Sequence, residues 1–153
     1  MLFLIKTNEL PMLNEEVRKI MTKDPVVVGP NDLVKDIPNL MFENQIQQIP
    51  VVENGKLVGL ITSYDLWQNS IGLKEKQGEK VKEVMTKKVI KIAPKDKVGT
   101  AAELFILKRF KTLPVVNLRN ELKGVVTAFD VIRHVFKKEY PNPILFKELL
   151  EAE

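Results

Sequence analysis

Two copies of one short motif contain the side chains best suited to bind a ligand. Thr62 stands three residues before Asp65, and Thr127 stands three residues before Asp130. A carboxylate can accept charge-assisted hydrogen bonds from the hydroxyl groups of a ligand. The same spacing is also that of a helix capping box, in which the two side chains bond each other's backbone N–H groups. The local spacing alone leaves both interpretations open.

Catalytic and metal-binding motifs are missing from the sequence. It has no cysteine, no Gly-rich phosphate loop, no Gly-x-Ser-x-Gly turn and no His-Glu-x-x-His pair. The only histidine, His134, lacks a partner at metal-ligand or catalytic-dyad spacing, and we expect it on the surface. The sequence therefore predicts a protein that is not an enzyme, binds no metal and requires no cofactor.

The composition is that of an ordinary globular chain. Of the 153 residues, 44% are hydrophobic and 29% are charged, which is not the balance of a disordered protein. No apolar run is long enough to span a membrane, and we expect a cytoplasmic protein without membrane contact. The net charge of +4 permits contact with nucleic acid. Because the lysines are spread along the chain and alternate with glutamates, we interpret this charge as solvated surface.

The sequence repeats itself once. Residues 17–22, 30–34 and 49–52 return 64 positions later as 81–86, 94–98 and 113–116. Residues 59–65 return as 124–130, and the offset there is 65. The added residue falls between two predicted strands, in a turn, where a folded repeat tolerates an insertion.

Each repeat predicts the same order of elements: a short strand, a helix, two strands and a helix. A helical turn with apolar residues at spacings of three and four precedes them, at 17–21 and at 81–85. Short β runs are predicted at 26–28 and 89–92. In repeat 1, strands at 49–53 and 57–62 flank Asn54-Gly55, a strong two-residue hairpin signal.

The long helix of each repeat is expected to begin near an aspartate that serves as its N-cap, Asp32 or Asp96. Pro38 should kink the first of these helices, because proline removes one backbone hydrogen bond. The second has an apolar face formed by Val98, Ala101, Ala102, Phe105 and Leu107.

Neither repeat has enough residues for a comfortable core of its own, so we expect the two to pack against each other. The predicted fold class is α/β, with two pseudo-symmetric repeats that form one module. The predicted boundaries are an N-terminal arm at 1–13, repeat 1 at 14–70, a linker at 71–78, repeat 2 at 79–138 and a C-terminal arm at 139–153.

With this repeated pattern the chain resembles the cystathionine-β-synthase-type (CBS) domain family. The family's marks are Met-Thr before the first strand, a hydrophobic-Pro-Val-Val strand, and Gly-hydrophobic-hydrophobic-Thr-x-x-Asp before the last helix. All three occur in both repeats, and the resemblance covers about residues 17–135. It implies a stand-alone CBS pair (a Bateman module) with two clefts that bind AMP, ADP, ATP, S-adenosylmethionine or a similar adenosine ligand. It also implies a disc-shaped homodimer that regulates another protein.

The resemblance assigns residues of both repeats to each cleft, with the aspartate expected to hold the ribose hydroxyls. Cleft one combines Thr62 and Asp65 of repeat 1 with Val89, Ile90, Lys111, Thr112 and Pro114 of repeat 2. Cleft two combines Thr127 and Asp130 of repeat 2 with Thr22, Val26, Val27, Gln47 and Pro50 of repeat 1.

The two clefts differ at the position where a ligand phosphate is expected. Lys111 of cleft one corresponds to Gln47 of cleft two, so we expect cleft one to be the better phosphate site. Arg133 and His134 follow Asp130 closely and could return positive charge to cleft two. Lys111 also has a simpler interpretation, as part of an exposed basic cluster.

Three further residues have a structural interpretation. Pro50 and Pro114 stand near strand starts, where a missing N–H does little harm, and are expected to be structural rather than to contact ligand. Trp67 is expected to pack in the core or at a dimer interface.

The predicted function is that of a sensor that binds an adenosine ligand and acts in trans on an effector protein, since the chain has no room for an effector domain. Two alternatives remain. One is a nucleic-acid-binding protein that uses its basic surface, and the other is a structural dimer with degenerate clefts. Binding to nucleic acid should weaken steeply with salt, which separates the first alternative from the sensor.

Overall fold

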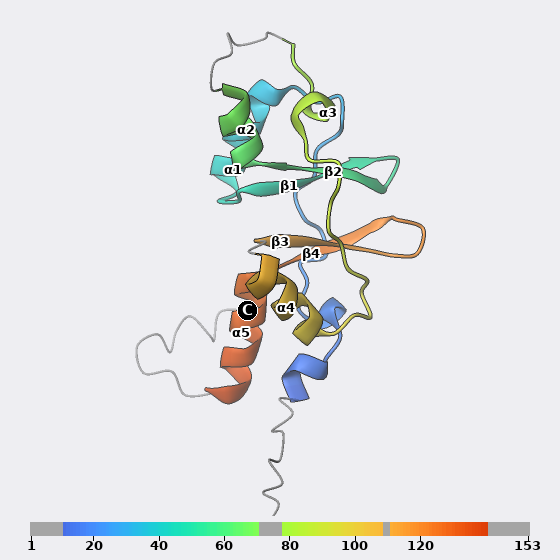
Figure 1. Ribbon diagram of the computed structural model, residues 1–153, viewed down its shortest axis with the longest axis vertical. Coiled ribbons are helices and arrows are strands. Elements are labelled where there is room, and N and C mark those ends of the chain that lie inside the picture. The colour runs from blue at the N-terminus through green and yellow to red at the C-terminus, as the bar shows by residue number, and fades with distance from the viewer. Residues whose placement is uncertain (1–10, 71–77, 109–110, 141–153) are drawn as a thin grey trace, which may run out of the picture.

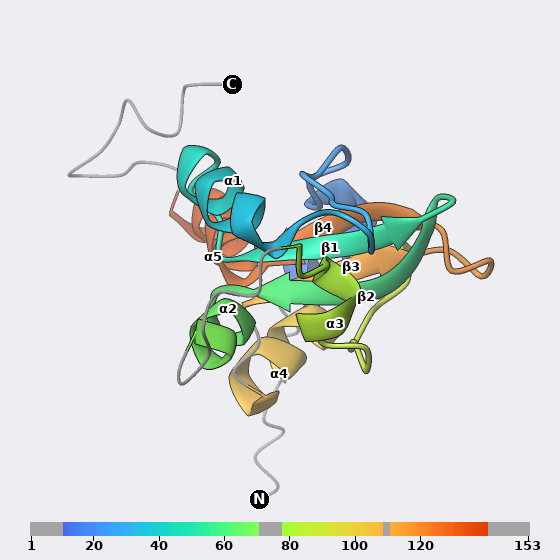
Figure 2. The ribbon, with the colours of Figure 1, turned by 90° about the horizontal axis from the view of Figure 1, so that it is seen from above.

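The computed structural model describes residues 11–70, 78–108 and 111–140. Two antiparallel β-hairpins, one from each repeat, lie one above the other, with α1, α2, α4 and α5 on one side of them (Figures 1 and 2). The predicted α/β fold of two similar halves is confirmed. In chain order the elements are η1 (Pro11–Asn14), η2 (Val17–Lys19), η3 (Val34–Asp36), α1 (Ile37–Glu43), β1 (Gln48–Glu53), β2 (Lys56–Thr62), α2 (Ser63–Ser70), α3 (Val81–Val84), α4 (Val98–Lys108), β3 (Thr112–Val116), β4 (Leu122–Thr127) and α5 (Ala128–Glu139).

The predicted linker and the two predicted arms lie mostly outside the described residues. The part of the N-terminal arm that is described forms η1, where Met12 is buried against the helices of repeat 2. No helix in the described ranges is long and apolar enough to span a membrane.

The hairpins are the most regular part of the fold. Asn54 and Gly55 form the first turn with φ angles of 51° and 76°, the left-handed values that such a two-residue turn requires. The hairpin predicted at this dipeptide is confirmed. Both hairpins have a register shift at the equivalent place, between Val51 and Val52 and between Val115 and Val116.

The short β runs predicted at 26–28 and 89–92 form only single bridges. Val28 pairs in parallel with Val51, and Ile92 pairs in the same way with Val115. The preceding residues of each run belong to no strand, so the predicted strands are wrong in extent.

The first helical turn of each repeat packs into the core of the other repeat. Val17 is fully buried in the core of repeat 2, and Val81 is fully buried in the core of repeat 1. The Val17 N–H donates to the carbonyl of Asp96 (2.8 Å), and the Val81 N–H donates to the carbonyl of Asp32 (2.9 Å). Full burial of a valine stabilises by about 1.5–3 kcal/mol. The expected packing of the repeats is confirmed, and each core depends on the other repeat's turn.

Asp32 and Asp96 are not the helix N-caps that the sequence predicts. Asp32 Oδ2 accepts a hydrogen bond from the Gly29 N–H, and Asp96 Oδ2 accepts one from the Ala93 N–H, both at 2.7 Å. Each carboxylate therefore closes the tight turn before its helix. α4 begins two residues after this turn, at Val98.

Pro38 shortens the long helix of repeat 1 and does not kink it. Proline has no N–H to donate to the carbonyl of Val34, four residues earlier. Ile37 donates to that carbonyl instead, which gives a 3-10 turn followed by the seven-residue α1. In repeat 2, α4 begins at the residue equivalent to Val34 and is α-helical for 11 residues. The predicted apolar face of α4 is wrong at Leu107, which is 74% exposed.

Candidate ligand clefts

The Thr-x-x-Asp motif lies where the last strand of each hairpin ends and α2 or α5 begins. Asp65 Oδ2 accepts hydrogen bonds from the N–H and the hydroxyl of Thr62, both at 2.8 Å, and the Asp65 N–H donates to Thr62 Oγ1 (3.1 Å). Thr127 and Asp130 form the same three bonds at 2.8, 2.7 and 3.2 Å. The capping interpretation is therefore confirmed at both helices.

The second carboxylate oxygen distinguishes the two aspartates. Asp65 Oδ1 accepts a hydrogen bond from the hydroxyl of Thr86 (3.2 Å), which belongs to repeat 2. This bond brings side chains of both repeats together at cleft one. Thr22 is the counterpart of Thr86, but within the described residues it makes no hydrogen bond to Asp130. Among residues 11–70, 78–108 and 111–140, no side chain or backbone group donates to Asp130 Oδ1.

Backbone pairing holds both Met-Thr segments against the opposite repeat. Thr86 and Leu60 of β2 exchange two hydrogen bonds of 2.9 Å. Thr22 and Val125 of β4 exchange two of 2.9 and 3.0 Å. The threonine of each repeat is thus fixed beside the strand that leads into the other repeat's aspartate.

A glycine in each of these strands makes the crossing possible. A Cβ atom at Gly124 would lie 2.4 Å from the carbonyl oxygen of Thr22, and one at Gly59 would lie 2.5 Å from the Met85 sulfur. Both distances are far below van der Waals contact. The Met-Thr and Gly parts of the repeated pattern are therefore the two sides of one contact between repeats.

Lys111 and Gln47, which the resemblance assigns to different clefts, contact each other. Lys111 Nζ donates to Gln47 Oε1 at 2.8 Å. The carbonyl of Gln47 accepts the N–H of Ser63, so the pair lies beside the start of α2. Thr112, the neighbour of Lys111, pairs with Thr127 at the start of α5. Because the ammonium lies between the two helix starts, its position does not by itself favour cleft one.

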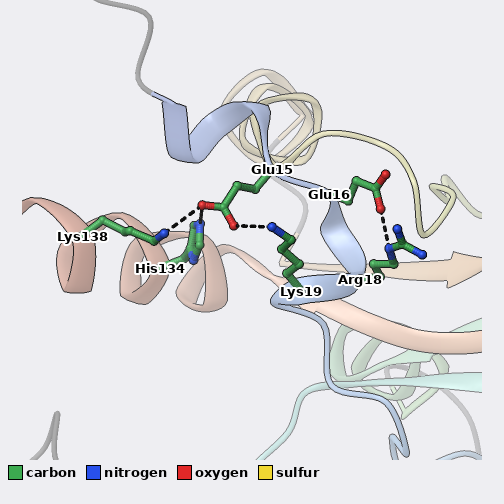
Figure 3. Close-up of polar contacts among 6 residues, drawn as sticks. All are labelled: Glu15, Glu16, Arg18, Lys19, His134 and Lys138. Atoms are coloured by element: carbon green, nitrogen blue, oxygen red, sulfur yellow. Dashed lines mark hydrogen bonds and ion pairs between the residues drawn. The ribbon is translucent and has the colours of Figure 1, made fainter.

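Arg133 and His134 are engaged away from the carboxylate of Asp130. The Arg133 guanidinium lies 4.8 Å from the ring centre of Phe129. The His134 side chain is only 13% exposed, and its Nε2 lies 3.7 Å from Glu15 Oε1 (Figure 3). The expectation that His134 is a surface residue is therefore wrong.

Glu15 links the N-terminal segment to α5 through ion pairs. Lys138 Nζ lies 3.0 Å from its carboxylate and Lys19 Nζ lies 3.2 Å from it, while Arg18 pairs with the neighbouring Glu16 (Figure 3). Hydrogen bonds from Lys138 first, and then from Lys19, lower the pKa of Glu15 below its ordinary value. This cluster orders the segment that leads to the Val17 turn.

The remaining predicted site residues lie in two environments. Val26 and Val89 are half-buried on the extended segments after Thr22 and Thr86, and the next residues, Val27 and Ile90, are 44% and 47% exposed. The rings of Pro50 and Pro114 are fully buried, so they offer no surface to a ligand.

Two residues beside the clefts are absent from the sets that the resemblance assigns. Thr86 is the counterpart of Thr22, and Gln48 is the counterpart of Thr112 at the same offset of 64. Gln48 Oε1 is buried and has no hydrogen-bond partner in the described part of the chain. The repeat itself was the signal for both, because a residue assigned to one cleft implies its equivalent in the other.

Two hollows open on repeat 1, and neither is lined by Asp65 or Asp130. One, of about 640 Å³, has a polar lining that includes Asp32, Asp36 and Glu43. The other, of about 860 Å³, lies between α1 and α2, with a lining that includes Phe42, Leu66 and Trp67. We call the second hollow the α1–α2 groove.

Charge is divided unequally between the repeats. Residues 14–70 contain five Lys and Arg against eight Asp and Glu, a net charge of −3. Residues 79–138 contain fifteen against six, a net charge of +9. The excess positive charge therefore belongs to repeat 2.

Comparison with known proteins gives a family match over most of the chain. A family model for the CBS domain matches residues 17–66 and 81–137. The uncharacterised protein MJ0188 of Methanocaldococcus jannaschii is 33% identical over 134 residues, which cover 86% of this chain and 48% of that protein. The chain therefore spans about half the length of the curated relatives it matches first.

Two solved structures match the fold over nearly their whole length. CBSX2 of Arabidopsis thaliana, in complex with AMP, has a TM-score of 0.75 and 26% identity, and the match covers 82% of this chain and 98% of CBSX2. The CBS domain pair of protein MJ0100, in complex with 5′-methylthioadenosine and S-adenosyl-L-methionine, has a TM-score of 0.70 and 26% identity, with coverages of 81% and 98%.

Proposed function

The chain belongs to the CBS domain family, and we propose that it binds an adenosine-containing ligand and thereby regulates a partner protein in trans. The proposed ligand class is AMP, ADP, ATP or S-adenosylmethionine. The complexes of CBSX2 with AMP and of the MJ0100 pair with S-adenosyl-L-methionine support this class. A cytoplasmic location and a role in binding without catalysis belong to the same proposal.

The observation that supports ligand binding best is the meeting of both repeats at Asp65. Its carboxylate accepts hydrogen bonds from Thr62 of its own repeat and from Thr86 of the other. The two vicinal hydroxyls of a ribose are donors of the same kind, and bonds to an ionised carboxylate are about twice as strong as neutral ones. A ligand there would contact both repeats at once and so report on their relative position.

A thermal-shift screen with AMP, ADP, ATP, S-adenosylmethionine, NAD and a short oligonucleotide tests this proposal. A ligand at about 100 times its dissociation constant adds roughly 2.7 kcal/mol of stability. For a protein of this size we expect Tm to rise by roughly 5–10 °C. The variant with both Asp65→Ala and Asp130→Ala should lose the shift. If no adenosine compound raises the Tm of the wild-type protein, the sensor proposal fails and a structural dimer with degenerate clefts remains.

The charge of repeat 2 supports a second candidate function, the binding of a nucleic acid. Its net charge of +9 is sufficient for sequence-independent contact with phosphates. The oligonucleotide in the screen tests this candidate. Its affinity should fall by orders of magnitude between 50 and 200 mM salt if several phosphates are contacted, whereas a mononucleotide should respond far less.

We further propose that the chain forms a homodimer through the exposed surface of α1, α2, α4 and α5, which we call the helical face. Large apolar side chains are exposed on all four helices, among them Phe42, Trp67, Ile106, Leu107, Phe129 and Ile132. Exposed apolar clusters on this scale are typical of interaction sites. Trp67 is 58% exposed, so the core position that was one of its two expected places is wrong. Sedimentation velocity tests the dimer, and a monomer at all concentrations would refute it.

A further inference from the structure

The turn of the second hairpin joins the two repeats. Figures 1 and 2 show the turns of both hairpins at the same end of the molecule. The carbonyl of Asn120 accepts the N–H of Leu57 in β2 (3.0 Å), and the carbonyl of Gly55 accepts the N–H of Leu122 in β4 (3.1 Å). Asn120 has a φ of 62°, a left-handed value that asparagine tolerates better than most residues. The hairpins are therefore paired through their backbones at this end.

The side chain of Asn120 makes two more hydrogen bonds from this position. Its Nδ2 donates to the carbonyl of Leu57 (2.7 Å), and its Oδ1 accepts a bond from Lys91 Nζ. The strand that contains Leu57 ends at Thr62, and Lys91 directly follows residues 89–90. Thr62 and residues 89–90 are assigned to cleft one from different repeats. One amide group thus links the strand and the extended segment that are expected to meet at cleft one.

Apart from this amide, the extended segment 87–91 has no polar partner in the described part of the chain. Bridges at Thr86 and at Ile92 fix its two ends. Between them, none of the backbone N–H and C=O groups bonds to another described residue. Lys91 is the only side chain of the segment that forms a hydrogen bond within the described ranges. Its bond to Asn120 is therefore the polar contact that sets how far the segment lies from β2.

The extended segment of repeat 1 is restricted in a different way. At the offset of 64, Pro25 stands in the place of Val89, and Val27 stands in the place of Lys91. The proline ring fixes φ at its position, and the valine side chain offers no hydrogen bond. The turn of the first hairpin is also one residue shorter than the turn that contains Asn120. Among the described residues, cleft two therefore has no counterpart of the amide link, and its extended segment is stiffened by a ring instead.

We propose that Asn120 is a positioning residue for cleft one, because it holds the extended segment at the separation from β2 that an adenosine ligand requires. The inference rests on the proposed adenosine ligand and adds a residue that acts on one cleft only. Ordering a segment at the moment of binding costs affinity, and a segment that is already held avoids this cost. Asn120 lies outside the sets of residues that the resemblance assigns, and it acts without touching the ligand.

Asn120→Gly tests the proposal, because glycine adopts a positive φ without strain and keeps both backbone bonds between the hairpins. Asn54→Gly is the matched control. Asn54 also has a positive φ, of 51°, in the turn of the other hairpin, and its side chain makes no hydrogen bond to a described residue. Calorimetric titration in the Asp130→Ala protein reports cleft one, and titration in the Asp65→Ala protein reports cleft two. The probe is AMP, ADP, ATP or S-adenosylmethionine, whichever gives the largest thermal shift.

We expect Asn120→Gly to weaken binding of the probe at cleft one about three- to tenfold and to leave cleft two unchanged. Asn54→Gly should change neither cleft. Lys91→Met removes the same link from its other end and should weaken the probe at cleft one by a similar factor. Because both substitutions break the bond between Asn120 and Lys91, the double variant should bind no more weakly than either single variant.

Equal losses at both clefts would mean that Asn120 only joins the hairpins, and would overturn the proposal. Wild-type affinity of Asn120→Gly at cleft one, or additive losses in the double variant, would also overturn it while leaving ligand binding intact. If no probe raises the melting temperature of the wild-type protein, the proposed function fails and this inference fails with it.

Discussion

Repeats 1 and 2 share one backbone plan but differ in the features that a ligand or partner would meet. Both have the same hairpin with a register shift at the same place, the same capping box, and the same Met-Thr crossing over a glycine. They differ in net charge, in the length of the long helix, and in whether a threonine reaches the aspartate. The shared positions are those at which the two halves interlock. Positions outside that contact differ, so the residues of the two candidate clefts are not equivalent.

The largest difference between the repeats is expected in the free energy of unfolding when the proline position of the long helix is changed. Ala102 of α4 is equivalent to Pro38, and its N–H lies in an α-helical turn. Ala102→Pro should remove one hydrogen bond and strain the turn, at a cost of about 3 kcal/mol in the free energy of unfolding. Pro38→Ala should change stability by less than about 1 kcal/mol, because the 3-10 turn already accommodates the proline. Denaturant unfolding of both variants measures the comparison, and equal losses would contradict it.

The two glycines at which the repeats cross should differ less in the stability that is lost when each is replaced by alanine. Gly124→Ala should cost about 2–3 kcal/mol, since the new Cβ would meet the backbone carbonyl of Thr22. Gly59→Ala should cost about 1 kcal/mol, because the atom it meets is the flexible end of Met85. Chemical denaturation with unchanged m-values gives both numbers. A larger loss at Gly59 would show that the Met85 contact is the more rigid one.

Lys111→Gln makes the two repeats identical at the position between the clefts. If the ammonium serves a ligand phosphate, affinity for AMP and ATP should fall about two- to fivefold, the range of an exposed ion pair. Adenosine, which has no phosphate, should bind the variant as it binds the wild-type protein. Calorimetric titration of the three ligands measures this. An equal loss for adenosine would mean that Lys111 acts by holding Gln47.

The smallest effect is expected from Glu15, whose counterpart in the other repeat, Glu79, accepts a hydrogen bond from the side-chain amide of Asn69. Because the folded-state pKa of Glu15 is lowered from the ordinary 4.5, its contribution to stability is present above that pH and is lost as the pH falls through the folded pKa. Glu15→Gln should lower Tm at pH 7 on the order of 1 °C. The difference from wild type should shrink as the pH falls below 4.5. A difference that grows in acid would contradict the assignment.

The sequence predicted the parts of the fold that rest on local rules. Asn54-Gly55 determines its hairpin, and the repeated Thr-x-x-Asp determines two helix starts, because turns and caps depend on neighbouring residues alone. Periodicity did not reveal that Val17 and Val81 each pack into the core of the other repeat. A buried valine gives the same sequence pattern whichever core it enters. Pro38 was misread because its effect depends on where the helix begins.

The candidate clefts were predicted only as far as equivalence between repeats was applied. Asp65 and Thr62 were found from the motif, and the contact of Asp65 with Thr86 required the chain to cross from one repeat to the other. Lys111 was placed with one cleft because nothing local indicates that it reaches Gln47. Side chains that meet across a pseudo-symmetry axis are separated by the full repeat length, which local pattern analysis does not span.

Calorimetric titration of wild type, Asp65→Ala, Asp130→Ala and the double variant, each with the adenosine ligand that gives the largest thermal shift, tests the central claim most directly. A lost carboxylate hydrogen bond is worth about 1.5–3 kcal/mol. In each single variant, the ligand should therefore bind roughly 10- to 100-fold more weakly to the cleft that contains the substituted aspartate. The account predicts unequal losses from the two single variants and a loss of roughly 10- to 100-fold at both clefts of the double variant. Binding by a folded double variant with wild-type affinity would contradict the assignment of the adenosine site to these two clefts.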